Sequence, residues 1–408
     1  MINKGVLMKV IDAHVHMGMN SFCENPKTEL KYNLENKYED YFRVFSSVDF
    51  YGACILPIPG LDYSSEKSNE YLLSSSKKSK GRFIPICRAD NDLGYNLNNG
   101  FSGCKIHRVY DGQKESQYLE YCRLIELYEK PLILHAEFKD KIKQIRKLTR
   151  LFPRLKIILA HMGRGHIYTS ENVLENAEEF KHNGNVFFET STVGNSETIS
   201  EVCRLVGSER IMFGTDYPFG KIWFGDNYRY EDELKVITNA KIKGHEKENI
   251  LFHTANNIFA PITEKKVYIT LYQKKYKEIL EEIINSLSEE DKKFLALKYK
   301  TSILRECVRK EKHIYLIFYE NEVVGFFRES GRPNGFYLIE ELAISSRYRG
   351  KHIATDVLQQ CKQMFPSHII KTNGSNFIMN GILQKLGYVG DGKKIITWKY
   401  DERVLSIK

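Results

Sequence analysis

Near its N-terminus the chain reads Val10-Ile11-Asp12-Ala13-His14-Val15-His16. The apolar residues predict a strand over Val10–Ala13, closed by two histidines two positions apart. Alternate side chains of an extended chain point to the same side, so His14 and His16 can present both imidazoles to one metal ion. Such a pair also occurs as polar decoration at a strand end, and the rest of the chain decides between the two interpretations.

Short apolar runs of this kind recur up to about residue 262 and alternate with longer amphipathic or charged stretches. The expected strands are Val10–Ala13, Ala53–Ile58, Phe83–Arg88, Gly103–His107, Leu132–His135, Ile157–His161, Val186–Thr190 and Ile211–Thr215. Strands separated by helices pair in parallel through right-handed crossovers, and eight such units in about 250 residues predict a closed (β/α)8 TIM barrel. An open doubly wound sheet would need a glycine-rich turn after the first strand, which the sequence lacks.

The pattern changes near residue 262. A strand over Val267–Tyr272 and a long charged helix over Gln273–Arg309 are expected first. A hairpin of Ile314–Tyr319 and Glu322–Arg328, a strand Phe336–Ile344, a helix Lys351–Met364, a strand Ile369–Lys371, a helix Asn376–Leu386 and a closing β-pair at Tyr388 and Ile395–Tyr400 follow. We therefore expect an α/β barrel over residues 1–262 and an α+β domain over residues 266–408.

The composition limits the partners of the protein. Of the net charge of +9, residues 264–408 carry +8, from 26 Lys and Arg against 18 Asp and Glu. These charges are mixed rather than arranged in a basic stripe, so we expect no nucleic-acid partner. Eight scattered cysteines without a C-x-x-C pair, no signal peptide and no run of eighteen apolar residues predict a cytoplasmic protein without a membrane partner. A homo-oligomer is compatible with the sequence.

Polar side chains stand at the ends of several expected strands. His135 ends the fifth strand, His161 the sixth and Asp216 follows the eighth, and the ends of barrel strands meet at one mouth. Together with His14 and His16 they offer the imidazole and carboxylate ligands of a catalytic divalent-metal site, for which we expect zinc. Asp216 is the expected base that takes a proton from the activated water, and it can also be a ligand.

The first domain resembles the amidohydrolase superfamily, in its branch of metal-dependent hydrolases and decarboxylases. The matching segments are Ile11-Asp-Ala-His-Val-His-Met-Gly18, Leu134-His-Ala136, Ala160-His-Met-Gly163, Gly214-Thr-Asp-Tyr-Pro218 and Asn256-Asn-Ile-Phe259. The resemblance implies metal ligation by His14, His16 and His135. It makes His161 a ligand or a substrate-polarising catalytic group, and Asp216 both ligand and catalytic base.

Five further polar residues near the expected mouth have open roles. Lys105 lies on the strand where dinuclear members of the superfamily carry a carbamylated lysine, and pairing with a carboxylate or a substrate anion is the favoured interpretation. For His107 we expect a hydrogen-bonded structural histidine. Arg88, Glu137 and Arg164 could orient a substrate, although salt-bridged loop residues are the expected alternative.

The second domain contains Leu342-Ala-Ile-Ser-Ser-Arg-Tyr-Arg-Gly-Lys-His-Ile-Ala354, which runs from a strand through a basic turn into a helix. Such a turn offers backbone N–H groups to a pyrophosphate. With the segment from Asn376 to Lys385-Leu-Gly-Tyr388, it resembles the GNAT-type N-acetyltransferases. The resemblance implies acetyl-CoA as cofactor, bound by the backbone of Leu342 and Ile344 and by Arg349, Gly350, Lys351, Ile353 and Ala354.

Two residues depart from the GNAT pattern. His352 replaces the central glycine of the turn, and Leu383 stands where many members have a tyrosine that acts as general acid. Glu340 or Glu341 is a candidate base for an amine acceptor, and on an alternating strand only one of them can face the groove.

We therefore expect a bifunctional enzyme, a metal-dependent hydrolase of a small metabolite fused to an acetyl-CoA-dependent N-acyltransferase. Two alternatives remain. The barrel could be a metal-dependent decarboxylase, or the C-terminal domain could sense acyl-CoA without catalysis.

Overall fold

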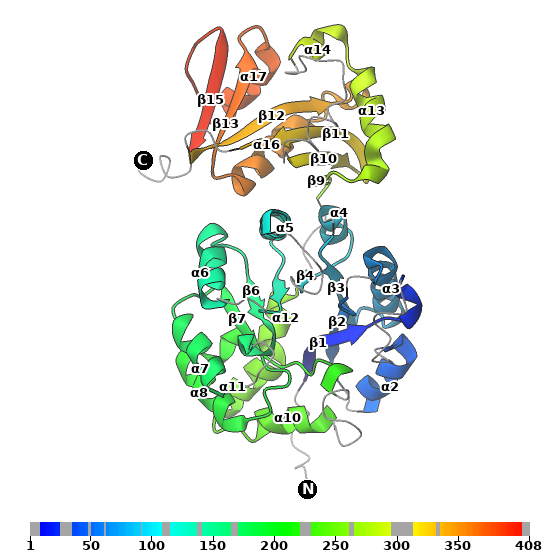
Figure 1. The fold of residues 1–408 in the computed structure, drawn as a ribbon, viewed down its shortest axis with the longest axis vertical. Coiled ribbons are helices and arrows are strands. Elements are labelled where there is room, and N and C mark those ends of the chain that lie inside the picture. The colour runs from blue at the N-terminus through cyan, green and yellow to red at the C-terminus, as the bar shows by residue number, and fades with distance from the viewer. Residues whose placement is uncertain are drawn as a thin grey trace. The chain divides into compact units, whose positions relative to one another are not determined.

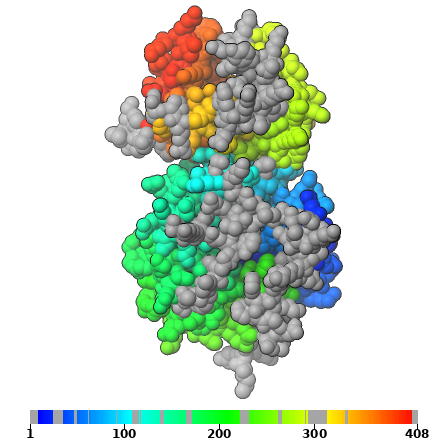
Figure 2. Space-filling model, viewed as in Figure 1, coloured from blue at the N-terminus to red at the C-terminus, as the bar shows by residue number. Residues whose placement is uncertain are grey.

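The computed structural model describes residues 9–24, 35–47, 50–60, 63–90, 92–107, 115–136, 141–164, 170–220, 230–260, 265–294, 313–331 and 335–401, which are coloured in Figures 1 and 2. The chain divides into two compact units. The first comprises Met1–Asp90 and Asn99–Thr263, and the second comprises Asn91–Asn98 and Glu264–Lys408. Among the described residues, no helix has the length and apolar character needed to cross a membrane.

Eight parallel strands form the first unit, in the order of the sequence (Figure 1). They are β1 (Ile11–Met17), β2 (Gly52–Pro57), β3 (Phe83–Arg88), β4 (Gly103–Ile106), β5 (Leu132–Leu134), β6 (Ile157–Leu159), β7 (Val186–Glu189) and β8 (Ile211–Met212). Helices lie between and beyond them: α2 (Tyr38–Ser47), α3 (Ser65–Lys78), α5 (Glu115–Leu127), α6 (Lys141–Leu151), α7 (Ser170–Glu179), α8 (Ser196–Val206), α10 (Tyr230–Thr238), α11 (Gly244–Glu248) and α12 (Thr254–Ile258). The predicted TIM barrel is confirmed.

Buried apolar side chains explain these elements. The described strands of the barrel are buried over almost their whole length, as expected when helices cover a parallel sheet. Helix α8 begins where the Asn195 side chain accepts hydrogen bonds from two backbone N–H groups, buries Ile199, Val202 and Val206 along one face, and ends at Gly207 with a φ of 85°.

The first and last strands approach each other through backbone hydrogen bonds that close the barrel. The N–H of Ala13 donates to the carbonyl of Phe213 at 2.8 Å, that of Asp216 to the carbonyl of His14 at 2.8 Å, and that of His16 to the carbonyl of Tyr217 at 2.7 Å. Strand β1 also extends to Met17, beyond the predicted end at Ala13. Both histidines of the opening stretch therefore lie within the strand and beside Asp216.

The second unit contains a seven-stranded mixed sheet in the order β14-β15-β13-β12-β11-β10-β9. Its strands are β9 (Val267–Leu271), β10 (His313–Tyr319), β11 (Glu322–Glu329), β12 (Tyr337–Ile344), β13 (Ser367–Asn373), β14 (Val389–Gly390) and β15 (Ile395–Asp401). Its helices are α4 (Leu93–Asn98), α13 (Lys277–Ser286), α14 (Glu289–Phe294), α16 (Ile353–Met364) and α17 (Phe377–Lys385). The predicted hairpin turns at Glu320 and Asn321, which both have positive φ.

Two features of this unit differ from the predictions. The long helix expected over Gln273–Arg309 is interrupted after Ser286, because Leu287 is extended and the Ser288 side chain accepts a hydrogen bond from the N–H of Asp291 at the start of α14. Residues 295–309 of that prediction lie outside the described part of the chain. Helix α4, between two barrel strands in sequence, belongs to the second unit.

Helix α4 fits closely against strand β9. The N–H of Gly94 donates to the Thr270 hydroxyl at 3.1 Å, and a Cβ atom at Gly94 would lie 2.2 Å from the carbonyl oxygen of Ile269. Asn98 exchanges two hydrogen bonds with the backbone of Lys265. A glycine is therefore required at this position for the helix to lie this close to the strand.

Candidate functional site

Two histidines and a carboxylate meet at the mouth of the barrel. The Nε2 atoms of His14 and His16 are 3.2 Å apart, and each is 3.3 Å from Oδ1 of Asp216. The barrel-closing hydrogen bonds fix this arrangement, since they tie the backbone of Asp216 to that of His14. All three residues are buried.

The spacing of these atoms suits a divalent metal ion. A tetrahedral zinc ion with nitrogen and oxygen ligands at its usual bond lengths requires ligand atoms about 3.3–3.5 Å apart. Two of the three observed separations, at 3.3 Å, lie in this range, and the third, at 3.2 Å, is within 0.1 Å of it. The Nδ1 of His16 is 2.6 Å from the carbonyl oxygen of Pro57, which can only accept, so Nδ1 carries the hydrogen and Nε2 presents its lone pair. These donors therefore fit a metal ion.

The other two predicted histidines lie beside this group. His161 Nε2 is 4.0 Å from Asp216 Oδ2, and its ring is stacked on that of His14 with centroids 5.2 Å apart. His135 contacts the His161 ring edge-to-face at 5.0 Å and stacks on His107 at 4.4 Å. Among the described residues, the close three-ligand groups contain His14, His16, Asp216, His161 and Glu189, whereas His135 is next to them.

Burial favours the neutral form of the His14 and His161 imidazoles. It lowers the pKa of His14 well below its usual value, and the positive charge of Lys105 lowers it further. The pKa of His161 is lowered by burial and then by the neighbouring His135 and Arg164. Neutral imidazole is the form that ligates metal ions and accepts protons.

Lys105 on β4 and His107, the residue after β4, lie beside His14 and His16. The Nζ of Lys105 is 3.1 Å from His14 Nε2, and the ring of His107 is 6.2 Å from that of His16. Lys105 is buried, and its amine lies beside a candidate metal ligand.

The proposed substrate-orienting residues have different surroundings. Arg88 donates to the carbonyl oxygens of Tyr63 and Gly60 at 2.9 and 2.6 Å and thereby holds the loop that follows β2. Arg164 is partly exposed and donates to the Thr192 hydroxyl at 2.7 Å. Glu137 lies outside the described residues.

Sequence reasoning missed two buried carboxyl groups. Glu189 ends β7 and lies 2.7 Å from His14 Nδ1; burial raises its pKa to about 8, against the effect of hydrogen bonds from Ser191 and His161. Glu233 on α10 is also buried, and burial together with the charge of Glu189 raises its pKa to about 8. The sequence offered one signal for Glu189, which is an acidic residue directly after the apolar run Val186–Phe188.

In the second unit, strand β12 separates from β13 halfway along its length. The two strands pair only from Tyr337 to Ile339, whereas β12 pairs with β11 from Ile339 to Ile344. Glu341 has a φ of 52°, which breaks the alternation of the strand. The backbone of Leu342 and Ile344 therefore lies where β12 no longer pairs with β13.

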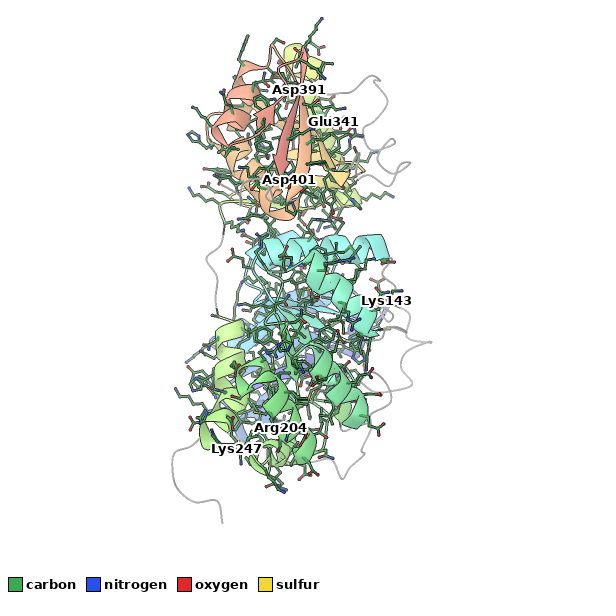
Figure 3. All side chains as sticks on the ribbon, turned by 90° about the vertical axis from the view of Figure 1, so that its left-hand side faces the viewer. Lys143, Arg204, Lys247, Glu341, Asp391 and Asp401 are labelled. Atoms are coloured by element: carbon green, nitrogen blue, oxygen red, sulfur yellow. The ribbon has the colours of Figure 1, made fainter. Side chains whose placement is uncertain are left out.

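The irregularity at Glu341 brings the side chains of both candidate glutamates to the same arginine. Arg328 Nη2 is 2.5 Å from a carboxylate oxygen of Glu341 and 3.0 Å from one of Glu340, so both acids reach one guanidinium group (Figure 3 labels Glu341). The Glu341 side chain is 1% exposed and that of Glu340 is 22% exposed. Glu340 is the more accessible candidate base.

The predicted coenzyme turn keeps the backbone of a glycine-rich turn. Gly350 has a φ of 77°, and His352 adopts a left-handed φ of 61° although it carries a side chain. His352 precedes α16 and makes no side-chain cap, so the first N–H groups of Ile353 and Ala354 face outward from the helix start. This is the arrangement that a pyrophosphate uses.

The basic residues of the turn have partners of their own. Arg349 donates to Asp291 of α14 at 2.7 Å, and Lys351 lies over the rings of Tyr319 and Tyr348. Leu383, in place of a tyrosine, is completely buried on α17.

The comparisons with known proteins agree with this architecture. Residues 69–257 match the amidohydrolase family model, and residues 278–388 match the acetyltransferase (GNAT) family model. The chain therefore combines a domain of the amidohydrolase family with a domain of the GNAT acetyltransferase family, as the sequence motifs predicted. Both family descriptions are those of enzymes.

Solved structures resemble the chain at low identity. A probable 2-pyrone-4,6-dicarboxylic acid hydrolase from Acinetobacter baumannii is 14% identical, covers 62% of this chain and 100% of its own, and has a TM-score of 0.52, which supports the fold. A putative 2-pyrone-4,6-dicarboxylic acid hydrolase from Pseudomonas putida is 18% identical, with coverage of 62% and 98% and a TM-score of 0.49. A 5-carboxyvanillate decarboxylase from Sphingomonas paucimobilis is 14% identical, with coverage of 63% and 100% and a TM-score of 0.48.

Proposed function

We propose that this chain is a bifunctional enzyme, a metal-dependent hydrolase of a small metabolite joined to an acetyl-CoA-dependent N-acyltransferase. The observation that carries the first half is the spacing of three donor atoms, from His14, His16 and Asp216, at the distances that one divalent ion requires. The proposed domains are residues 1–262 and 266–408.

His14, His16 and Asp216 would hold the ion, with zinc as the expected metal, and the family resemblance adds His135. A divalent ion bound there lowers the pKa of a water ligand and polarises a substrate carbonyl group. Lys105 is placed to bind an anionic group of the substrate.

Asp216 and His161 would transfer the protons of the reaction. Oδ1 of Asp216 faces the two Nε2 atoms, which leaves Oδ2 to accept a proton from the attacking water. The neutral His161, whose Nε2 is 4.0 Å from Oδ2, can take that proton and return it to the leaving group.

For the second half, the separation of β12 from β13 leaves the backbone of Leu342 and Ile344 to bind a pantetheine arm. The turn at Arg349, Gly350 and Lys351 and the uncapped start of α16 at Ile353 and Ala354 would bind the pyrophosphate. Glu340 would accept the proton of the amine.

The hydrolase proposal is tested with protein purified without chelator. We expect about one equivalent of zinc, loss of hydrolysis of an amide, ester and lactone panel after chelation, and recovery on adding zinc. His14→Gln should lose the metal, whereas the exposed His182→Gln should keep it. Full activity without metal would contradict the proposal, and carbon dioxide release without incorporation of solvent oxygen would show a decarboxylase.

The acyltransferase proposal is tested with acetyl-CoA. We expect calorimetric binding by the full chain and thiol release with a panel of primary amines. Binding without turnover would leave the C-terminal domain as a sensor of acyl-CoA, and absence of binding would contradict both.

A further inference from the structure

The carboxyl group of Glu189 contacts several groups around the candidate metal site. Its Oε2 is 2.7 Å from His14 Nδ1, 2.8 Å from the Ser191 hydroxyl and 3.2 Å from the backbone nitrogen of His161, and its Oε1 accepts from the backbone N–H of Ser191. We infer that Glu189 is a positioning residue that fixes the tautomers of His14 and, through Ser191, of His161, so that both direct an unprotonated Nε2 toward the metal position.

The hydrogen-bond partners of Glu189 determine its role. The backbone N–H groups of His161 and Ser191 can only donate, and one points at each carboxyl oxygen. Glu189 therefore accepts from both backbone groups, and its ionised form, which a nearby divalent ion favours, accepts from His14 as well. His14 then donates from Nδ1, which leaves the lone pair on Nε2, 3.3 Å from Asp216.

Ser191 extends this control to the second histidine. Its hydroxyl donates to Glu189, so the oxygen's lone pairs are available to the Nδ1 of His161 at 2.8 Å. The carbonyl oxygen of Ser191 is 3.3 Å from the same nitrogen and can only accept. Nδ1 of His161 therefore carries the hydrogen, and its Nε2 faces Asp216.

The chain leaves room for this carboxyl group at a glycine. A Cβ atom at Gly214 would lie 2.2 Å from Oε1 of Glu189 and 2.9 Å from the Cβ of His14. Gly214 precedes Asp216 by two residues. The segment that supplies the candidate ligand Asp216 therefore also leaves space for the Glu189 side chain.

The inference rests on the proposed function for the metal, whereas the tautomers can be observed without it. Partners that orient a metal-ligating histidine typically contribute 10–100-fold to metal affinity. The effect of Glu189 should therefore appear both in the imidazole proton positions and in the dissociation constant for zinc.

The test uses full-length protein with 15N-labelled histidine. At pH 9 without metal, NMR should show His14 and His161 protonated at Nδ1 and unprotonated at Nε2. Glu189→Gln has one acceptor oxygen instead of two, so His14 should move its hydrogen to Nε2 and zinc affinity should fall about 10–100-fold. Ser191→Ala removes the hydroxyl at 2.8 Å but keeps the backbone carbonyl at 3.3 Å, so only part of the His161 population should move its hydrogen to Nε2. Zinc affinity should change less than about threefold, because His14 keeps its bond to Glu189.

Wild-type His14 protonated at Nε2, or a Glu189→Gln variant that binds zinc as the wild type does, would overturn the inference. If Glu189→Gln fails to fold, the wild-type tautomers and the Ser191→Ala variant still decide it. Correct tautomers in a wild type that binds no zinc would contradict the proposed function instead.

Discussion

Replacement of Gly214 by alanine tests the structure of the metal site without replacing a ligand. The new Cβ would lie 2.2 Å from Oε1 of Glu189, and ordinary contact begins at 3.4 Å, so the carboxyl group must move by about 1.2 Å. Its side-chain hydrogen bonds with His14 and Ser191, now 2.7 and 2.8 Å long, would then exceed bonding distance.

The expected cost follows from those bonds. Each hydrogen bond to a charged group contributes about 1.5–3 kcal/mol, so at pH 9, above the pKa of Glu189 near 8, losing both should destabilise the barrel by about 3 kcal/mol or more. Thermal unfolding of the full chain measures this loss, and competition with a chromophoric chelator measures zinc affinity, which should fall about 10-fold or more.

Gly184→Ala is the matched control, because a Cβ atom there would meet nothing within 4 Å. Its unfolding temperature and zinc affinity should remain close to those of the wild type. The reasoning is refuted if Gly214→Ala behaves like Gly184→Ala in both measurements.

Three further predictions concern the second unit. Gly94→Ala should lower the thermal stability of this unit by about 1–3 kcal/mol because the new Cβ overlaps β9, although alanine normally favours a helix. Gly381→Ala, in open space on α17, should raise the stability by up to about 1 kcal/mol. Equal effects of the two substitutions would contradict the close fit of α4 to β9. His368 is buried, and burial lowers its pKa to about 4, below the unfolded value near 6.5. About 3 kcal/mol of stability that is present above pH 6.5 should therefore be lost as the pH falls to 4. His368→Gln should lack this loss in acid unfolding, and a variant with the pH profile of the wild type would be contrary evidence. His352→Gly should stabilise the turn by about 1 kcal/mol, because glycine adopts the left-handed backbone without strain. Since the His352 side chain is exposed, the acetyl-CoA affinity measured by calorimetry should change less than about threefold. A large loss of affinity would show that the imidazole binds the phosphate.

The barrel could be predicted because each strand is a compact apolar run, and local sequence suffices to locate such runs. The candidate ligands could be predicted from the spacing of His14 and His16 and from the position of Asp216 after a strand. A parallel barrel brings such strand ends together. Their distances depend on the closure between β1 and β8, which only the folded chain forms.

Other features depend on contacts between distant segments. Glu189 is 175 residues from His14, and one acidic residue after an apolar run gives no indication of that contact. The membership of α4 in the second unit likewise depends on the match of Gly94 to β9. The break after Ser286 was readable, because Ser288 with Asp291 three residues later is a helix-start signal inside a charged stretch.

An anomalous-scattering map of crystals grown with zinc is the most direct test of the metal site. The structure predicts one strong peak at the barrel mouth, within about 2.0–2.2 Å of His14 Nε2, His16 Nε2 and Asp216 Oδ1. A map with no peak there, or with zinc bound only elsewhere, would contradict the metal-dependent hydrolase.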